Sequence, residues 1–208
     1  MSSRRIKPAK QGQLDGACGF YAILNAMTAL EHSLQRKEVF TQVIAAFMQD
    51  GNFSKYFDGT KRGTIKNTLS RVIDYFNTEF EFFDDKTQEC FQFEFSIPYW
   101  LKGTSPSRKE VLEYLDLADN GKEYICIVGY DFYTGDPNEP LGGHWSVVRK
   151  TSEKGLHMLD SSEEKSIIPL SELTVDSSRN PGPSKPYNLT SADIFIIRIK
   201  WLGELVAL

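Results

Sequence analysis

Cys18 stands at the start of an apolar helical pattern, within the segment QLDGACGFYAI at residues 13–23. In the first turn of a helix, unpaired backbone N–H groups and the positive end of the helix dipole favour the thiolate, the nucleophilic form of cysteine. Gly16 and Ala17 leave space in front of the sulfur, and Gly19 would let a substrate carbonyl approach N–H groups that hold an oxyanion. The segment predicts a cysteine nucleophile; the alternative is burial as a small apolar side chain.

A cysteine nucleophile needs an imidazole that takes and returns a proton, and the chain has 3 histidines. His32 is excluded, because a helix rising about 1.5 Å per residue would place it about 20 Å from Cys18. His157 lies in the apolar run LHML, where we expect a core or sheet-surface position. His144 directly follows a Gly-Gly pair and opens the run HWSVV, so we expect it to be the general base.

Asp160 ends the run LHML and is the expected partner of His144. Two antiparallel strands joined by the turn SEKG would bring this carboxylate back beside the imidazole. It would accept a hydrogen bond from the ring and fix its tautomer. Glu163 or Glu164 takes this role if the register of the hairpin slips.

An amide side chain shortly before the cysteine predicts an oxyanion hole. Gln13 can donate its N–H to the developing oxyanion together with the backbone N–H of Cys18. Gln11 competes with Gln13 for this role.

The elements that must position these residues follow from the spacing of apolar side chains. Helical spacing predicts three helices, over residues 18–30, 37–48 and 64–76. A capping box, Ser107 with Glu110, predicts a fourth helix that closes near residues 120–121. Alternating or continuous apolar runs predict strands at 79–83, 91–95, 124–130, 144–148, 156–159 and 194–199. A helical front half before a β-rich back half indicates an α+β fold.

The composition is that of a globular protein. The 208 residues are 40% hydrophobic and 25% charged, with a net charge of −4, so neither nucleic acid nor a membrane is expected as a partner. The 3 cysteines lack paired spacing, so we expect no disulfide framework and no zinc site. No signal-peptide pattern follows the basic start, which indicates a cytoplasmic protein. We expect a flexible arm at residues 1–10 and a single domain over 11–208.

These motifs together resemble the papain-like cysteine peptidase superfamily, in the chain order Gln13, Cys18, His144 and Asp160. The spacing from Gln13 to Cys18 and the segment HWSVVRKTSEKGLHMLDSS are most similar to Josephin-type deubiquitinases, and the Cys-Gly opening is similar to bacterial C39-like peptidases. The segment DGAC also resembles the DGxC motif of ovarian-tumour-type deubiquitinases, in which backbone forms the oxyanion hole. In that case Gln13 would be structural.

The resemblance implies a papain-like fold and a thiol protease that cleaves a peptide or isopeptide bond through a Cys18–His144–Asp160 triad. Its expected partner is a protein or peptide substrate, with ubiquitin-like proteins among the candidates. Neither a metal nor an organic cofactor is expected. Two alternatives stay open: an acyltransferase or transglutaminase-like enzyme with the same triad, and a non-catalytic binding module that keeps the fold.

Overall fold

The computed structural model describes residues 16–49, 59–100, 106–118, 121–133, 142–162, 166–177 and 184–204. The expected basic arm, residues 1–10, lies outside these ranges. Among the described residues, no helix is both long enough and apolar enough to cross a membrane.

Each predicted helix is present close to its expected position. They are α1 (Cys18–Leu30), α2 (Arg36–Met48), α3 (Arg62–Glu79) and α4 (Arg108–Leu115). The capping box of α4 is confirmed: the Ser107 hydroxyl accepts from the Glu110 N–H, and the Glu110 carboxylate accepts from the Ser107 N–H. The expected end near residues 120–121 is wrong. The helix stops at Leu115, because the chain tightens there and the Ala118 N–H bonds to the Leu115 carbonyl.

The first helix, α1, is buried on nearly all sides and not only along the apolar residues whose spacing predicts it. Only Tyr21 of its 13 residues is not buried. Small side chains such as Ala22 and Ala26 are also buried and allow close packing on the other faces of the helix. Phe20 packs on Phe47 of α2 with ring centroids 4.7 Å apart, and each such burial contributes about 1.5–3 kcal/mol. The first turn of α1 is therefore anchored in the core.

Within the described part of the chain, the strands form one sheet of 8 strands. They are β1 (Phe82–Asp84), β2 (Glu89–Ser96), β3 (Tyr124–Phe132), β4 (Gly142–Ser152), β5 (Gly155–Leu159), β6 (Ile167–Ile168), β7 (Leu173–Val175) and β8 (Tyr187–Glu204), with a 3₁₀ turn, η2, at Leu170–Glu172. Along the sheet the order is β1-β2-β8-β3-β4-β5-β6, and these neighbours are antiparallel. The remaining strand, β7, pairs parallel with β8.

Three differences from the predicted strands have local causes. The strand expected at 79–83 begins later, because the Phe80 N–H still bonds to the Phe76 carbonyl at the end of α3. The last strand begins before 194–199, at Tyr187, through a polar stretch that shows no alternation. The two short strands β6 and β7 are too brief for a periodic signal.

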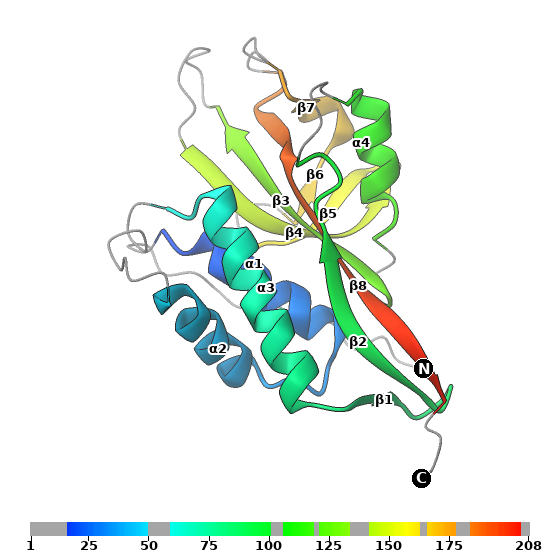
Figure 1. Cartoon of the computed structure of the whole chain (residues 1–208). Coiled ribbons are helices and arrows are strands. Elements are labelled where there is room, and N and C mark those ends of the chain that lie inside the picture. The colour runs from blue at the N-terminus through cyan, green and yellow to red at the C-terminus, as the bar shows by residue number, and fades with distance from the viewer. Residues whose placement is uncertain are drawn as a thin grey trace.

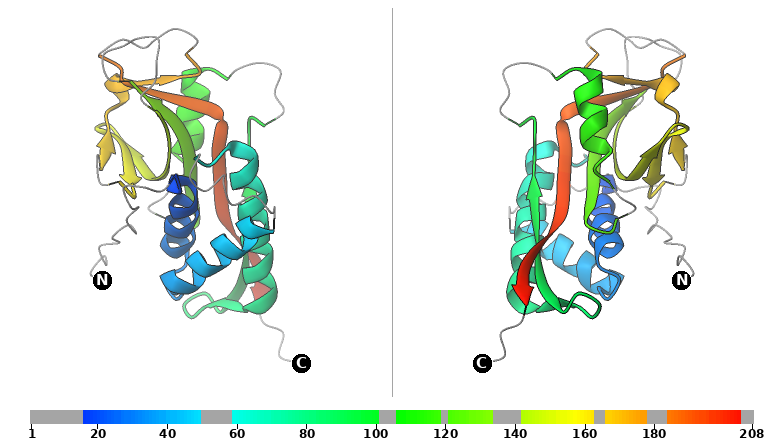
Figure 2. Two further views of the ribbon diagram at one scale, coloured as in Figure 1. Left: turned by 90° about the vertical axis from the view of Figure 1, so that its left-hand side faces the viewer. Right: turned by 90° about the vertical axis from the view of Figure 1, so that its right-hand side faces the viewer.

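Both faces of the sheet are covered. Side chains of β3 alternate between two cores: Ile125 and Ile127 join the cluster under α1, α2 and α3, while Cys126 and Val128 join the cluster under α4. Figure 1 shows the first three helices together on one side of the sheet and α4 on the other, and the turned views of Figure 2 show the same arrangement. The architecture is α+β, with helices on a mainly antiparallel sheet.

Candidate active site

Cys18 is the first residue of α1, as predicted, and its side chain is 7% exposed. The residue before the helix is Ala17, whose side chain cannot cap the first turn by a hydrogen bond. The Ala17 carbonyl accepts from the N–H groups of Phe20 and Tyr21, at 2.8 and 3.1 Å. Among the described residues, the N–H of Cys18 itself has no acceptor. This N–H and the positive end of the helix dipole therefore lie beside the side chain of Cys18.

Gly19 does not open space for a substrate, which corrects the sequence-based expectation. A Cβ at this position would lie 2.1 Å from Cδ1 of Ile65 and 2.4 Å from the hydroxyl oxygen of Thr60. The N–H of Gly19 donates to that same hydroxyl at 3.2 Å. Glycine is required at position 19 because Thr60 and Ile65 pack against its Cα, so that Thr60 caps α1 from a distant part of the chain.

His144 lies near the start of β4, directly across from Tyr130 of β3. The two rings meet edge to face, with centroids 5.5 Å apart. Nε2 of His144 is 3.1 Å from both carboxylate oxygens of Asp160. A carboxylate can only accept, so Nε2 carries the proton and Nδ1 is the ring nitrogen left for the Cys18 thiol.

Asp160 reaches His144 through the predicted hairpin of β4 and β5, in which Val147 pairs with Leu159. Its side chain is 5% exposed. Besides His144, it accepts from the N–H and hydroxyl of Ser162, at 2.7 and 2.5 Å, and from the Tyr130 hydroxyl at 3.3 Å. The buried carboxylate is thus surrounded by donors. Ser162 and Tyr130 were not predicted, although a serine two residues after an aspartate is a known turn signal.

The pKa values of His144 and Asp160 depend on each other. Burial alone lowers the pKa of His144, but its hydrogen bonds with Asp160 and then with the Cys18 side chain raise that pKa to about 10. Burial raises the pKa of Asp160, but the hydrogen bond from His144, followed by the donors of Ser162, brings that pKa well below its usual range. The geometry therefore favours an imidazolium held by a carboxylate at neutral pH.

Cys18 and His144 open onto one cleft of about 390 Å³. Its walls come from α1, the segment before α3, and strands β3, β4 and β8, and include Thr60 and Asp193. Asp160 is buried and does not line the cleft, but it is hydrogen-bonded to His144, which does. The cleft joins the helical layer to the sheet, so a substrate in it would contact both.

A bulge in β8 shapes one wall of this cleft. Val128 of β3 pairs with Ile194, but Tyr130 pairs with Leu189, so extra residues of β8 loop out opposite Gly129. Asp193 in this bulge lies against Gly129, where a Cβ would come within 2.8 Å of the Asp193 Cβ. A glycine inside a strand pattern was the available sequence signal for this bulge.

The bulge places a salt bridge in the cleft. Asp193 pairs with Arg62 at the start of α3. The Arg62 guanidinium also lies over the ring of Trp100, at 5.9 Å from its centroid. Asp131 lies in the same wall, and burial, followed by the nearby Asp193, raises the pKa of its carboxyl group. Neither this pair nor Asp131 was predicted from the sequence.

Trp145 connects the sheet to the segment before α3 through a hydrogen bond. Its side chain is 6% exposed, and its Nε1–H donates to the Thr60 carbonyl at 2.7 Å. Trp145 is next to His144 in the chain, and Thr60 binds the residue next to Cys18. Thr60 is thus hydrogen-bonded to the neighbours of both Cys18 and His144.

The other two histidines lie away from the cleft. His32 follows α1, and its Nδ1 is 3.1 Å from the Thr28 carbonyl. His157 lies on β5 and bonds to the Ser152 hydroxyl at 2.8 Å. Neither lines the cleft of Cys18, in agreement with the choice of His144.

Four predicted candidates lie outside the described residues. They are Gln13, Gln11, Glu163 and Glu164. The amide donor of the oxyanion hole therefore stays a sequence-based prediction. The described ranges also contain no group of three His, Cys, Asp or Glu side chains arranged to hold a metal ion.

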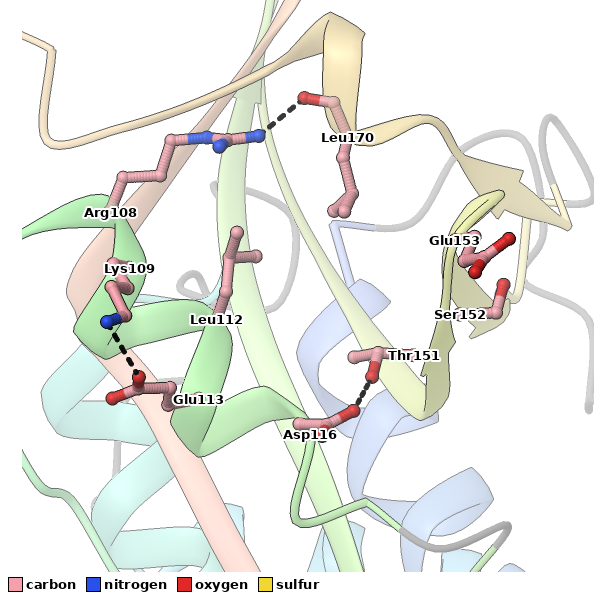
Figure 3. Close-up of a pocket in the computed structure, with 9 residues that line it drawn as sticks. All are labelled: Arg108, Lys109, Leu112, Glu113, Asp116, Thr151, Ser152, Glu153 and Leu170. Carbon is pink, nitrogen blue, oxygen red and sulfur yellow. Dashed lines mark hydrogen bonds and ion pairs between the residues drawn. The ribbon is translucent and has the colours of Figure 1, made fainter.

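A second cavity, of about 580 Å³, lies on the other face of the sheet, between α4 and the β4–β5 hairpin (Figure 3). Its polar groups are engaged with one another: Arg108 donates to the Leu170 carbonyl at 2.7 Å, and Thr151 donates to Asp116. Lys109 lies 3.8 Å from Glu113. Among the described residues that line this cavity there is no cysteine and no histidine.

Comparison with known proteins adds no assignment. No protein-family model matches the chain, and no curated protein matches it either.

Proposed function

We propose that the protein is a cysteine peptidase of papain-like fold that hydrolyses a peptide or isopeptide bond. The observation that carries this proposal is that His144 is hydrogen-bonded to Asp160 and lines one cleft with Cys18, whose side chain helps to raise the pKa of the ring. Cys18 is the nucleophile, His144 the general acid and base, and Asp160 the group that orients the histidine.

The raised pKa of His144 supports this assignment. A ring with a pKa of about 10 is protonated at neutral pH and can pair with a Cys18 thiolate. The first turn of α1 adds the positive end of its dipole beside the sulfur. The thiolate is the nucleophilic form of cysteine, and a protonated ring beside the sulfur favours that form.

The first half of the reaction forms a thioester. The sulfur of Cys18 attacks the substrate carbonyl carbon, a C–S bond forms, and the π electrons move onto the oxygen as an oxyanion. The oxyanion then collapses and the C–N bond breaks. The proton at Nδ1 of His144 passes to the leaving amine, which departs neutral.

The second half releases the acid. A water molecule gives one proton to Nδ1 of His144 while its oxygen attacks the thioester carbon. A C–O bond forms, the C–S bond breaks, and the electron pair returns to the sulfur of Cys18. The thiolate and the imidazolium are then restored. Throughout, Asp160 holds the ring by Nε2 and stays ionised.

A panel of electrophilic probes tests the proposal. Ubiquitin-like proteins that end in an electrophile, together with a peptide aldehyde, are incubated with the wild type, Cys18→Ala and Cys90→Ala. We expect adducts with the wild type and with Cys90→Ala, because Cys90 lies on β2 outside the cleft, and none with Cys18→Ala. Which probe reacts identifies the substrate class. Adducts that survive Cys18→Ala, or no adduct with any probe, contradict the proposal.

A further inference from the structure

Thr60 lies beside the reactive cysteine, immediately before α3. It is 8% exposed, and it lines the same cleft as Cys18 and His144. Its position is set from two sides: the hydroxyl accepts from the Gly19 N–H at 3.2 Å, and the carbonyl accepts from Trp145 Nε1–H at 2.7 Å. A buried polar side chain in a cleft wall is therefore held in one orientation.

The hydroxyl of Thr60 has a hydrogen that it does not use within the described residues. A hydroxyl offers one donor and two acceptor lone pairs. The Gly19 N–H occupies a lone pair, and no described residue accepts the hydroxyl hydrogen. A buried donor without a partner is costly, at about 1–3 kcal/mol, so such a donor in a cleft wall points to a ligand acceptor.

The acceptor that the proposed chemistry creates at this place is an oxyanion. Gly19 directly follows Cys18, so an oxygen bound to the Gly19 N–H lies against the backbone of the nucleophile. The Cys18 N–H also has no acceptor among the described residues. Oxyanion holes are built from backbone N–H groups, side-chain donors or both, so the Cys18 N–H and the Thr60 hydroxyl are donors of the required kind.

We infer that Thr60 is a further catalytic residue, whose hydroxyl donates a hydrogen bond to the oxyanion beside the Cys18 N–H. This inference rests on the proposed function. No proton is transferred in the step: the hydrogen bond strengthens as the carbonyl π electrons move onto the oxygen and weakens when the C–N bond breaks. The same donor serves the oxyanion of the second half-reaction.

The test compares two reactions of Cys18. Acylation by p-nitrophenyl acetate passes through an oxyanion, whereas alkylation by iodoacetamide displaces iodide at a tetrahedral carbon and forms none. Thr60→Val keeps the shape of the side chain without its hydroxyl, and Thr60→Ser keeps the hydroxyl. We expect Thr60→Val to lower the acylation rate about 100-fold. Its alkylation rate should stay at the wild-type value, and Thr60→Ser should retain most of the acylation rate.

Other outcomes overturn the inference. An unchanged acylation rate in Thr60→Val means that the hydroxyl does not contact the oxyanion. An equal fall of acylation and alkylation means that Thr60 only positions Cys18. If Thr60→Val does not fold, Thr60→Ala replaces it, since a water molecule can then satisfy the Gly19 N–H. A wild type that is alkylated at the rate of an ordinary thiol and is never acylated contradicts the proposed function itself.

Discussion

The carboxylate of Asp160 holds His144 by a single ring atom, with both of its oxygens 3.1 Å from Nε2. This arrangement fixes the orientation of the ring and leaves Nδ1 for exchange with Cys18. Because the carboxylate is buried and surrounded by donors, it stays ionised and stabilises the imidazolium.

Asp160→Asn should lower the pKa of His144 from about 10 toward its ordinary value. The amide keeps the shape of the side chain but loses the charge that favours the protonated ring. NMR titration of the histidine ring protons measures this shift. His157 serves as the internal control, because it bonds to Ser152 outside the cleft and should titrate equally in both proteins. If the pKa of His144 does not change, the Asp160 carboxylate is not what raises it.

The stability difference between the wild type and Asp160→Asn should depend on pH. The pKa of His144 is raised from 6.5 to about 10 on folding, so its contribution is complete below about pH 6.5 and is lost as the pH rises toward 10. The pKa of Asp160 is lowered, so its contribution is present above about pH 4 and is lost at more acidic pH. Urea unfolding should show the largest difference near pH 5 to 6. A stability difference that does not fall as the pH rises from about 6.5 toward 10 would contradict the linkage.

His144→Ala should slow acylation of Cys18 by about 10²–10⁴-fold, the usual contribution of general acid–base catalysis. Single-turnover reaction with p-nitrophenyl acetate gives the rate. His32→Ala is the matched control, since His32 lies beyond α1 and bonds to the Thr28 carbonyl. Equal rates in the two variants would remove His144 from the mechanism.

Gly19→Ala should destabilise the fold by about 1–3 kcal/mol through overpacking. Its methyl group would meet Ile65 and Thr60 at 2.1 and 2.4 Å. Gly63→Ala is the control: it lies in α3 with no atom within 4 Å of a new Cβ, and it should gain about 0.4–1 kcal/mol. Urea unfolding compares both variants with the wild type. Unchanged stability in Gly19→Ala would mean that Thr60 does not pack on this glycine.

Trp145→Phe should cost about 1–3 kcal/mol, because the buried Thr60 carbonyl loses its donor at 2.7 Å. It should also slow acylation of Cys18, since Thr60 is less firmly held. Trp201→Phe is the control: Trp201 packs on Phe91 with ring centroids 5.5 Å apart and does not line the cleft. That variant should leave acylation unchanged. If Trp145→Phe is acylated at the wild-type rate, Trp145 does not help to position Thr60.

Much of the fold could be predicted from short-range patterns. Helical spacing located α1 and placed Cys18 at its first residue, and the capping box located the start of α4 at Ser107. A hairpin between two apolar runs predicted the meeting of His144 and Asp160. These features depend on neighbours within one helix or one hairpin, which the sequence displays directly.

Other features of the site arise between distant segments. Thr60 caps α1 across 41 residues, and Trp145 reaches the Thr60 carbonyl across 85. The bulge that brings Asp193 beside Gly129 depends on how β8 pairs with β3, which no local pattern specifies.

The sequence by itself determined the residue types able to do the chemistry, the helix that carries Cys18 and the hairpin that carries His144 and Asp160. Only the tertiary structure decided that Thr60, and not a substrate, occupies the space at Gly19, and that Tyr130 and Ser162 surround Asp160. The physical reason is that periodicity and turn chemistry act over a few residues, whereas the partners of a buried polar group are set by how the layers pack.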